Sequence, residues 1–236
     1  MKIWQLNNGY TIFQVLQGRS NSFLISTSHG NVLVDTGLKF SRKKLIKNIK
    51  SLNLQPANID FLILTHSHFD HCKNARFLKE RFGCQLIIGE SEMEFAIKGY
   101  SPAPRGTMWF SKLISWLGNK MGKIILGYEK FYPDYSVKQP FSLKKFGYDI
   151  DLISTPGHSS GSISIIANSE IGIVGDTMFG IFRNLILPPF ADNKYELIES
   201  WKKLLATNCN LFLPGHGKAI TRELIEKAFK SFKKLD

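Results

Sequence analysis

The sequence predicts an α+β fold in which strands and amphipathic helices form one domain over residues 1–236. Short apolar runs that are rich in branched residues and end at polar turns are typical of buried strands. Longer segments with apolar residues three and four positions apart predict helices that bury one face. At 236 residues and 43% hydrophobic, the chain is long enough for one substantial core, and no linker divides it.

The expected elements follow one another along the chain. In the first half, strands are expected at Tyr10–Gln14, Ser22–Ser26, Asn31–Val34, Ile59–Leu64 and Gln85–Ile88, and helices at Ser41–Leu52, Asn74–Phe82 and near Ser91–Lys98. In the second half, strands are expected at Tyr148–Ser154, Ser162–Ala167, Ile171–Val174 and Leu211–Leu213, and helices at Asn193–Ala206 and Glu223–Leu235.

Three of the six histidines lie in one short segment, His66 to His71, which also contains Asp70. The segment follows the apolar run Ile59–Leu64, so it occupies the loop at the end of an expected strand. Imidazole and carboxylate together are ligands that suit zinc and neighbouring first-row metals. Core packing does not explain such a concentration of histidines. The segment therefore predicts a metal site.

Further potential ligands end other apolar runs. His158 and His216 each follow a Pro-Gly turn after an expected strand, and Asp176 ends the run that begins at Ile171. His29 lacks such a context and is expected to be a solvated turn residue. Cys72 directly follows His71, but it is expected to be a buried packing thiol because its neighbours already supply ligands.

The ligand order resembles that of the metallo-β-lactamase superfamily. The matching features are His-x-His-x-Asp-His, a strand-end His, a strand-end Asp and a final Gly-His, together with the early turn Asp35-Thr36-Gly37. The resemblance runs from about Val32 to Thr221 and implies a four-layer αββα sandwich with metals at one edge of two sheets. It also implies two metals, one held by His66, His68 and His158, the other by Asp70, His71 and His216, with Asp176 between them.

The resemblance implies a hydrolase with two zinc ions, with iron or manganese as the alternative metals. Two zinc ions about 3.5–4 Å apart share a water and lower its pKa toward about 7, so that hydroxide attacks a carbonyl carbon at neutral pH. Asp70 and Asp176 then orient the nucleophile and relay its proton. The turn at Gly175–Phe179 and the ending Leu213–Thr221 are similar to the glyoxalase II-like branch, which hydrolyses thioesters, with lactonases as a neighbouring branch.

Two other activities of the superfamily stay open. The first-site ligands alone could hold one iron, as in a sulfur (persulfide) dioxygenase. A phosphodiesterase or nuclease is the second alternative, and the net charge of +12 suits an anionic substrate. Much of this charge lies on helix faces, for example at Lys43, Lys44 and Lys47, so nucleic acid is not the expected partner. A member that only binds a partner is disfavoured by the intact ligand set.

The segment Tyr100–Tyr135 is the least regular part of the chain and varies most in the superfamily. We expect a lid-like substrate wall here, while an oligomer interface and a membrane-surface helix stay open. As a wall, it would bring Trp109, Phe110 and Trp116 to the cleft and favour an acyl group with an apolar tail. Phe179, three residues after Asp176, is a further expected substrate contact.

The remaining features predict the surroundings of the protein. The N-terminal segment has no apolar stretch of signal-peptide length, and no run reaches the roughly 18 apolar residues of a spanning helix. Three cysteines without CxxC spacing favour a reducing compartment. We therefore expect a cytoplasmic enzyme acting on a small acyl ester, thioester or lactone. A homodimer stays open, and membrane association is not expected.

Overall fold

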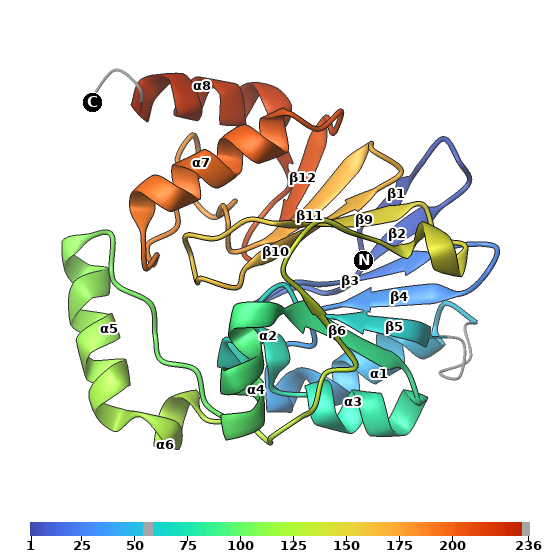
Figure 1. Cartoon of the computed structure of the whole chain (residues 1–236), viewed down its shortest axis with the longest axis horizontal. Coiled ribbons are helices and arrows are strands. Elements are labelled where there is room, and N and C mark those ends of the chain that lie inside the picture. Colours follow the sequence, from blue (N-terminus) through green and yellow to red (C-terminus); the bar gives the residue numbers. More distant parts are fainter. Residues whose placement is uncertain (54–58, 233–236) are drawn as a thin grey trace.

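The computed structural model describes residues 1–53 and 59–232 and contains two mixed β-sheets (Figure 1). The first has the order β1-β2-β3-β4-β5-β6-β7 and the second β13-β12-β11-β10-β9-β8. The strands of the first sheet are β1 (Ile3–Gln5), β2 (Thr11–Leu16), β3 (Ser22–Ser26), β4 (Asn31–Val34), β5 (Ile59–Ile63), β6 (Gln85–Gly89) and β7 (Tyr135–Val137). Those of the second are β8 (Phe141–Ser142), β9 (Ile150–Ser154), β10 (Ile163–Ala167), β11 (Ile171–Gly175), β12 (Leu211–Pro214) and β13 (Ile220–Thr221).

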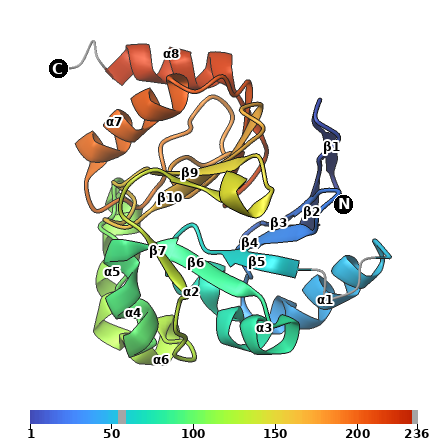
Figure 2. The ribbon, with the colours of Figure 1, turned by 45° about the vertical axis from the view of Figure 1, so that its right-hand side comes forward.

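Helices cover the outer faces of both sheets. The α-helices are α1 (Arg42–Lys50), α2 (Phe69–Cys72), α3 (Ala75–Phe82), α4 (Met93–Lys98), α5 (Trp109–Met121), α6 (Lys123–Leu126), α7 (Lys194–Leu205) and α8 (Arg222–Phe232). Short 3-10 turns are η1 (Lys39–Ser41), η3 (Glu90–Glu92) and η4 (Leu143–Phe146). Figure 2 shows α1 and α3 beneath the first sheet and α7 and α8 above the second.

Side-chain alternation along the strands produces the layers. Phe23 and Ile25 of β3 point into the core between the two sheets, whereas Leu24 joins the cluster under α1 and α3. Successive strand residues point to opposite faces, so a strand that is apolar throughout can bury both. A third cluster places Leu197, Trp201 and Leu204 of α7 on the outer face of the second sheet. This helix–sheet–sheet–helix order is the four-layer sandwich expected from the sequence.

Parallel pairing brings the functional loops to one edge of each sheet. β4 pairs in parallel with β5, and β11 with β12, so the loops after these strands leave the sheets side by side. Asn21, just before β3, then joins the two edges. Its backbone N–H donates to the carbonyl oxygen of Gly215 at 2.7 Å, and its side-chain amide donates to that of Pro214 at 2.9 Å.

The expected strands and long helices are present, and their ends in the described part of the chain differ from the expected ones by at most two residues. The last residues of the helix expected to reach Leu235 lie outside the described part of the chain. The irregularity expected at Tyr100–Tyr135 is wrong for the middle of this segment, which forms α5 and α6, whereas the residues before α5 and after α6 have little regular structure. Two of its glycines mark helix ends: Gly122 separates the two helices and Gly127 ends the second. The short strands β1, β7, β8 and β13 were not expected.

Candidate metal centre

The histidine segment is positioned by the end of β5 and by the single turn of α2. His68 precedes this turn in an extended conformation, and its carbonyl oxygen accepts the backbone N–H groups of His71 and Cys72 at 2.9 and 3.1 Å. The change from extended chain to helical turn points these side chains toward two neighbouring groups of donors, and His66 and His71 also converge on Asp176. His66 and His68 face one group, and Asp70 and His71 face another.

The first group consists of His66, His68 and His158, whose ligand atoms all lie within 4.8 Å of one another. Nδ1 of His68 is 2.9 Å from Nε2 of His158, and the buried Nε2 of His66 has no hydrogen-bond partner. Burial lowers the pKa of both His68 and His158 to about 4 and that of His66 well below its usual range. Burial therefore favours the neutral form of these three imidazoles, which is the form that can offer a ring-nitrogen lone pair to a cation.

The second group consists of Asp70, His71 and His216. Nε2 of His71 lies 3.3 Å from Nε2 of His216, which is 3.6 Å from Oδ2 of Asp70. Burial lowers the pKa of His71 and His216, but nearby carboxylates raise it by more, so the net shift of both is upward. These carboxylates are Asp176 and Asp35 for His71, and Asp176 and Asp70 for His216. The histidines of this second group are surrounded by carboxylates, and they are therefore more easily protonated than the histidines of the first group.

Asp176 lies between the two groups. Its Oδ2 is 3.5 Å from Nε2 of His158 and 3.3 Å from Nε2 of His216, and its Oδ1 is 3.3 Å from Nε2 of His71. Burial raises the pKa of this carboxyl, but the three histidines lower it by more, to well below its usual range. Gly215 permits the approach, because a Cβ there would lie 2.4 Å from Oδ1 of Asp176.

The arrangement suits divalent cations. Nitrogen and carboxylate donors from two sheets converge, one histidine nitrogen is buried without a partner, and the ionised Asp176 faces both groups. The residues therefore fit divalent cations, as the resemblance to the metallo-β-lactamase superfamily implies. Each group takes donors from both halves of the chain, since His158 or His216 completes it.

Two of the histidines are oriented by contacts to the ring nitrogen that faces away from the other donors. Nδ1 of His71 lies 2.8 Å from Oδ2 of Asp35, which also accepts from the hydroxyl of Thr65 at 2.8 Å. Nδ1 of His158 lies 2.9 Å from the carbonyl oxygen of Phe190. Such partners set which ring nitrogen faces a metal. Asp35 was noted in the sequence only as part of an early turn, and its contact with His71 was not foreseen.

Glu92 ties the histidine segment to the second sheet. Its side chain is fully buried and accepts from the backbone N–H of Ser67 at 3.0 Å, from the hydroxyl of Ser67, and from the backbone N–H of Gly161 at 3.2 Å. A carboxylate at 0% exposure with three donors holds the loop between His66 and His68 in place. Nothing in the sequence around Glu92 pointed to this role.

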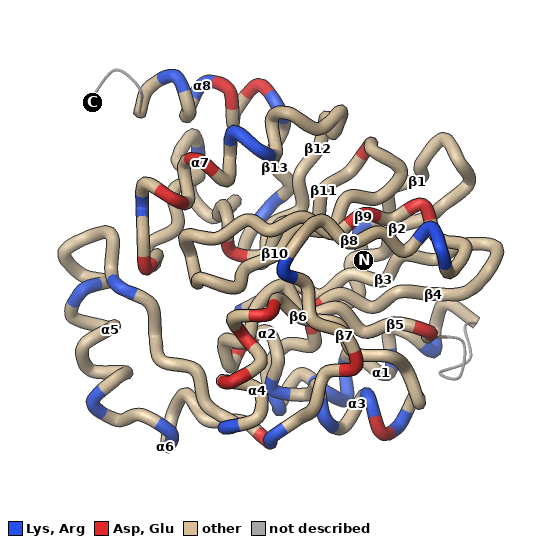
Figure 3. The backbone as a smooth tube through the Cα atoms, viewed as in Figure 1, with Lys and Arg blue, Asp and Glu red and all other residues tan. Residues whose placement is uncertain are grey.

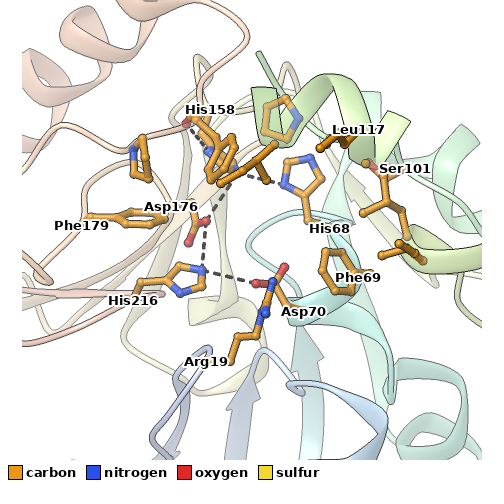
Figure 4. A pocket seen from close by; sticks show the side chains of 18 of the residues that line it. Arg19, His68, Phe69, Asp70, Ser101, Leu117, His158, Asp176, Phe179 and His216 are labelled. Carbon is orange, nitrogen blue, oxygen red and sulfur yellow. Dashed lines mark hydrogen bonds and ion pairs between the residues drawn. The ribbon is translucent and has the colours of Figure 1, made fainter. Parts of the chain in front are cut away.

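An open cavity of about 750 Å³ lies above the metal groups (Figure 4). His68, Asp70, His158, Asp176 and His216 form its polar floor. Most of the remaining lining is apolar and comes from the loops and from α2, α5 and α6: Phe69, Ala103, Pro104, Ile114, Leu117, Met121, Ile125, Leu126, Phe179, Ile181, Pro189 and Phe190. Arg19 is the one cationic side chain among the described lining residues.

Of the four expected substrate contacts, one lines the cavity and three do not. Phe179 lines the cavity, and its ring centroid is 4.5 Å from that of His216. The expectation that Trp109, Phe110 and Trp116 line the cleft is wrong for the cavity that the described residues form. Helix α5 does contribute a wall, but through Ile114, Leu117 and Met121, because its tryptophans point to the other side.

Residues set aside in the sequence lie where expected. His29 is exposed in a turn. Cys72 is buried, and its thiol donates to the carbonyl oxygen of Ser67 at 3.1 Å, outside both metal groups. Burial raises the pKa of this thiol well above its usual range. None of the helices in the described part of the chain is long and apolar enough to cross a membrane.

Comparisons with known proteins agree with this geometry. The model of the metallo-beta-lactamase superfamily matches residues 15–216. A probable metallo-hydrolase of Methanocaldococcus jannaschii is 30% identical over 204 residues, covering 84% of this chain and 88% of that protein. The hydroxyacylglutathione hydrolase GloC of Haemophilus influenzae is 29% identical over 218 residues, covering 89% and 91%. A solved metallo-β-lactamase of Cronobacter sakazakii shares the fold, with a TM-score of 0.70, 17% identity, and 100% and 94% coverage.

Proposed function

Because this chain belongs to the metallo-β-lactamase superfamily, we propose that it is a metal-dependent hydrolase of acyl thioesters, esters or lactones. Residues 1–236 act as a single domain in this proposal. Its cofactors are two divalent metals, with zinc as the metal that these ligands suit best. The ligands are His66, His68 and His158 for one metal and Asp70, His71 and His216 for the other, with Asp176 shared.

The observation that carries the proposal is the position of these donors at the floor of an apolar cavity. The two groups of ligand atoms converge there, and Asp176 contacts a histidine of each, His158 and His216. The floor is polar and the walls are apolar. Such a site orients a reacting polar group at its base and binds an apolar tail above it.

When bound, two such cations supply a nucleophilic hydroxide at neutral pH and polarise the oxygen under attack. The chain itself orients the nucleophile through two carboxylates. Asp176 stays ionised because three histidines lower its pKa. Asp70 lines the cavity beside His216, where its oxygen can accept a proton from water and return it to the leaving group. We propose these two residues as the catalytic carboxylates.

The apolar walls favour an acyl substrate over a nucleic acid. A phosphodiester backbone needs cationic contacts along its length, whereas Arg19 is the one cation among the described lining residues. The relative GloC is named as a hydroxyacylglutathione hydrolase, which supports a thioester as substrate. Persulfide oxidation at one iron would leave the second group without a role. Since the three described cysteines are free thiols, we propose that the enzyme works in the cytoplasm.

The deciding experiment is metal analysis of the full chain purified without added metal, together with hydrolysis of acyl thioesters and lactones. We expect two zinc ions per chain and hydrolysis that a chelator abolishes. One iron per chain, with consumption of oxygen on a persulfide and no hydrolysis, would replace this proposal with the dioxygenase. Cleavage of a phosphodiester without acyl hydrolysis would replace it with the nuclease.

A further inference from the structure

Helix α5 differs from an ordinary surface helix, because polar residues lie on its face toward the protein and large apolar residues face solvent. Its face toward the rest of the protein carries Ser111, Ser115 and Asn119, spaced four residues apart. Ser115 donates to the carbonyl oxygen of Pro104 at 2.7 Å, and Asn119 exchanges hydrogen bonds with the backbone of Ala103 at 2.8 and 3.0 Å. Polar contacts, rather than a buried apolar stripe, therefore hold this helix against the protein.

The large apolar side chains of α5 lie on its other two faces. Ile114, Leu117 and Met121, at helical spacing, line the cavity above the metal groups. Trp109, Leu113 and Trp116 form a neighbouring stripe that faces solvent, with 83%, 54% and 58% of each side chain exposed. Two exposed tryptophans on one helix stripe are uncommon on a surface that contacts water alone.

Helix α6 continues this surface after Gly122. Ile124 is 86% exposed and follows Lys123. We call the exposed residues Trp109, Leu113, Trp116 and Ile124, with the cations Lys112, Lys120 and Lys123, the α5–α6 surface. In Figures 1 and 2 these two helices stand at the margin of the molecule, apart from the two sheets.

The charge of the α5–α6 surface has one sign. Between Glu94 and Glu129 the sequence contains five Lys and Arg residues and no Asp or Glu. Figure 3 shows the Lys residues of α5 and α6 in blue and no acidic residue along these two helices. The ammonium group of Lys120 lies 5.2 Å from the ring centroid of Trp116, so cation and aromatic ring share one site. Tryptophan, aliphatic and lysine side chains on one short helix are typical of helices that lie in a membrane interface.

We propose that the α5–α6 surface docks onto an anionic lipid surface. Apolar burial and attraction of cations to anionic headgroups both contribute to such binding. A second copy of the chain is the less favourable occupant, because it would bring two surfaces of the same sign together in a protein of net charge +12. The proposal takes up the membrane-surface helix that the sequence left open for this segment, against the expectation that the protein does not associate with a membrane.

The cavity lies beside the docking surface, so docking would bring a substrate held in the lipid close to the metal groups. This consequence rests on the proposed function. The solvent-facing stripe of α5 lies next to the stripe that lines the cavity, and Ile114 and Leu117 are themselves partly exposed at its opening. An amphiphilic acyl thioester or ester held in the lipid surface would therefore meet the cavity through its apolar tail. The docking does not itself require hydrolysis.

The test is flotation of the metal-loaded full chain with vesicles, in the absence of substrate. We expect binding to phosphatidylcholine vesicles that contain phosphatidylglycerol, little binding to phosphatidylcholine alone, and weaker binding at high salt. Replacing Lys112, Lys120 and Lys123 with Gln should weaken binding about fivefold per charge, or roughly 100-fold in total. The matched control replaces Lys43, Lys44 and Lys47 of α1 with Gln and should change binding less than about threefold.

A second pair of variants tests the apolar contribution. Trp109→Ser with Trp116→Ser should abolish flotation, whereas Phe40→Ser, which removes an aromatic ring 80% exposed on η1, should not. Tryptophan fluorescence of the wild type should shift to the blue on anionic vesicles. Absence of binding, or equal loss in the α1 variant, would overturn the proposal. The proposal would also be overturned if the wild type formed a dimer in sedimentation, bound no vesicles, and lost the dimer when Trp116 was replaced by Ser. Failure of hydrolysis with intact flotation would count against the proposed function alone.

Discussion

Oδ2 of Asp35 lies 2.8 Å from Nδ1 of His71, at the point where the parallel strands β4 and β5 end side by side. Asp35 also receives the backbone N–H and the hydroxyl of Thr65, at 2.9 and 2.8 Å. The carboxylate is therefore fixed by the neighbouring strand before it contacts the histidine. This directs Nε2 of His71 toward His216 and Asp176.

Asp35→Asn should selectively weaken the second metal group. The amide still fills the space, but it removes the negative charge that orients His71 and makes it more basic. We expect metal affinity at that group to fall about 10–100-fold, while the first group keeps its metal. Competition with a chromophoric chelator measures both affinities. Asp60→Asn, which changes a carboxylate bonded to Tyr148, is the control. Equal loss at both groups would contradict this assignment.

The two proposed catalytic carboxylates should differ when replaced. Asp70→Ala should remove most hydrolysis while His66, His68 and His158 retain a metal, because Asp70 belongs to the second group alone. Asp176→Ala should reduce the metal content of both groups, since its oxygens face histidines of each. Metal analysis beside a hydrolysis assay checks this. Identical metal loss in the two variants would mean that Asp176 is not shared.

Acidification should release the two metals in a fixed order. Burial lowers the pKa of His68 and His158 to about 4, so protons compete at the first group near that pH. For His71 and His216, burial is outweighed by the carboxylate of Asp176, which raises their pKa above 6.5. Protons therefore compete there at higher pH. Dialysis at stepwise lower pH, followed by metal analysis, should show one metal lost first. Simultaneous release would refute this order.

The cavity wall of α5 should determine the preferred acyl length. Leu117→Trp fills part of the apolar cavity and should reduce kcat/KM for long-chain acyl thioesters about tenfold, with little effect on acetyl thioesters. Leu113→Trp adds the same side chain on the stripe that faces solvent, and it should leave the ratio of long to short substrates unchanged. A parallel fall in the rates of both substrate lengths for Leu117→Trp would mean that the wall does not select the tail.

The sequence was most informative where one local pattern determines the outcome. Apolar runs such as Asn31–Val34 coincide with strands, because a strand buried on both faces needs little beyond its own composition. The donors of the metal groups also stand out, since each ends such a run. Their assignment to one metal or the other followed from the resemblance to a family, and it stays a proposal.

Relationships that depend on tertiary pairing could not be read from the chain. The contact of Asp35 with His71 requires the parallel alignment of β4 with β5, and that of Glu92 with Ser67 and Gly161 requires three separate loops. Helix α5 shows a different difficulty. Hydrophobicity alone would turn Trp109 and Trp116 inward, but hydrogen bonds of Ser115 and Asn119 to residues 103–104 turn the opposite face to the protein.

Each donor group combines residues from both halves of the chain, and this affects when a metal can bind during biosynthesis. While the ribosome has made only the first sheet, the nascent chain carries two donors of each group, and the third arrives with His158 or His216. A cation that is held by the three donors of either group is therefore bound only after the second sheet has formed and docked. Metal loading would then mark completed molecules, and truncated or misassembled chains would remain empty.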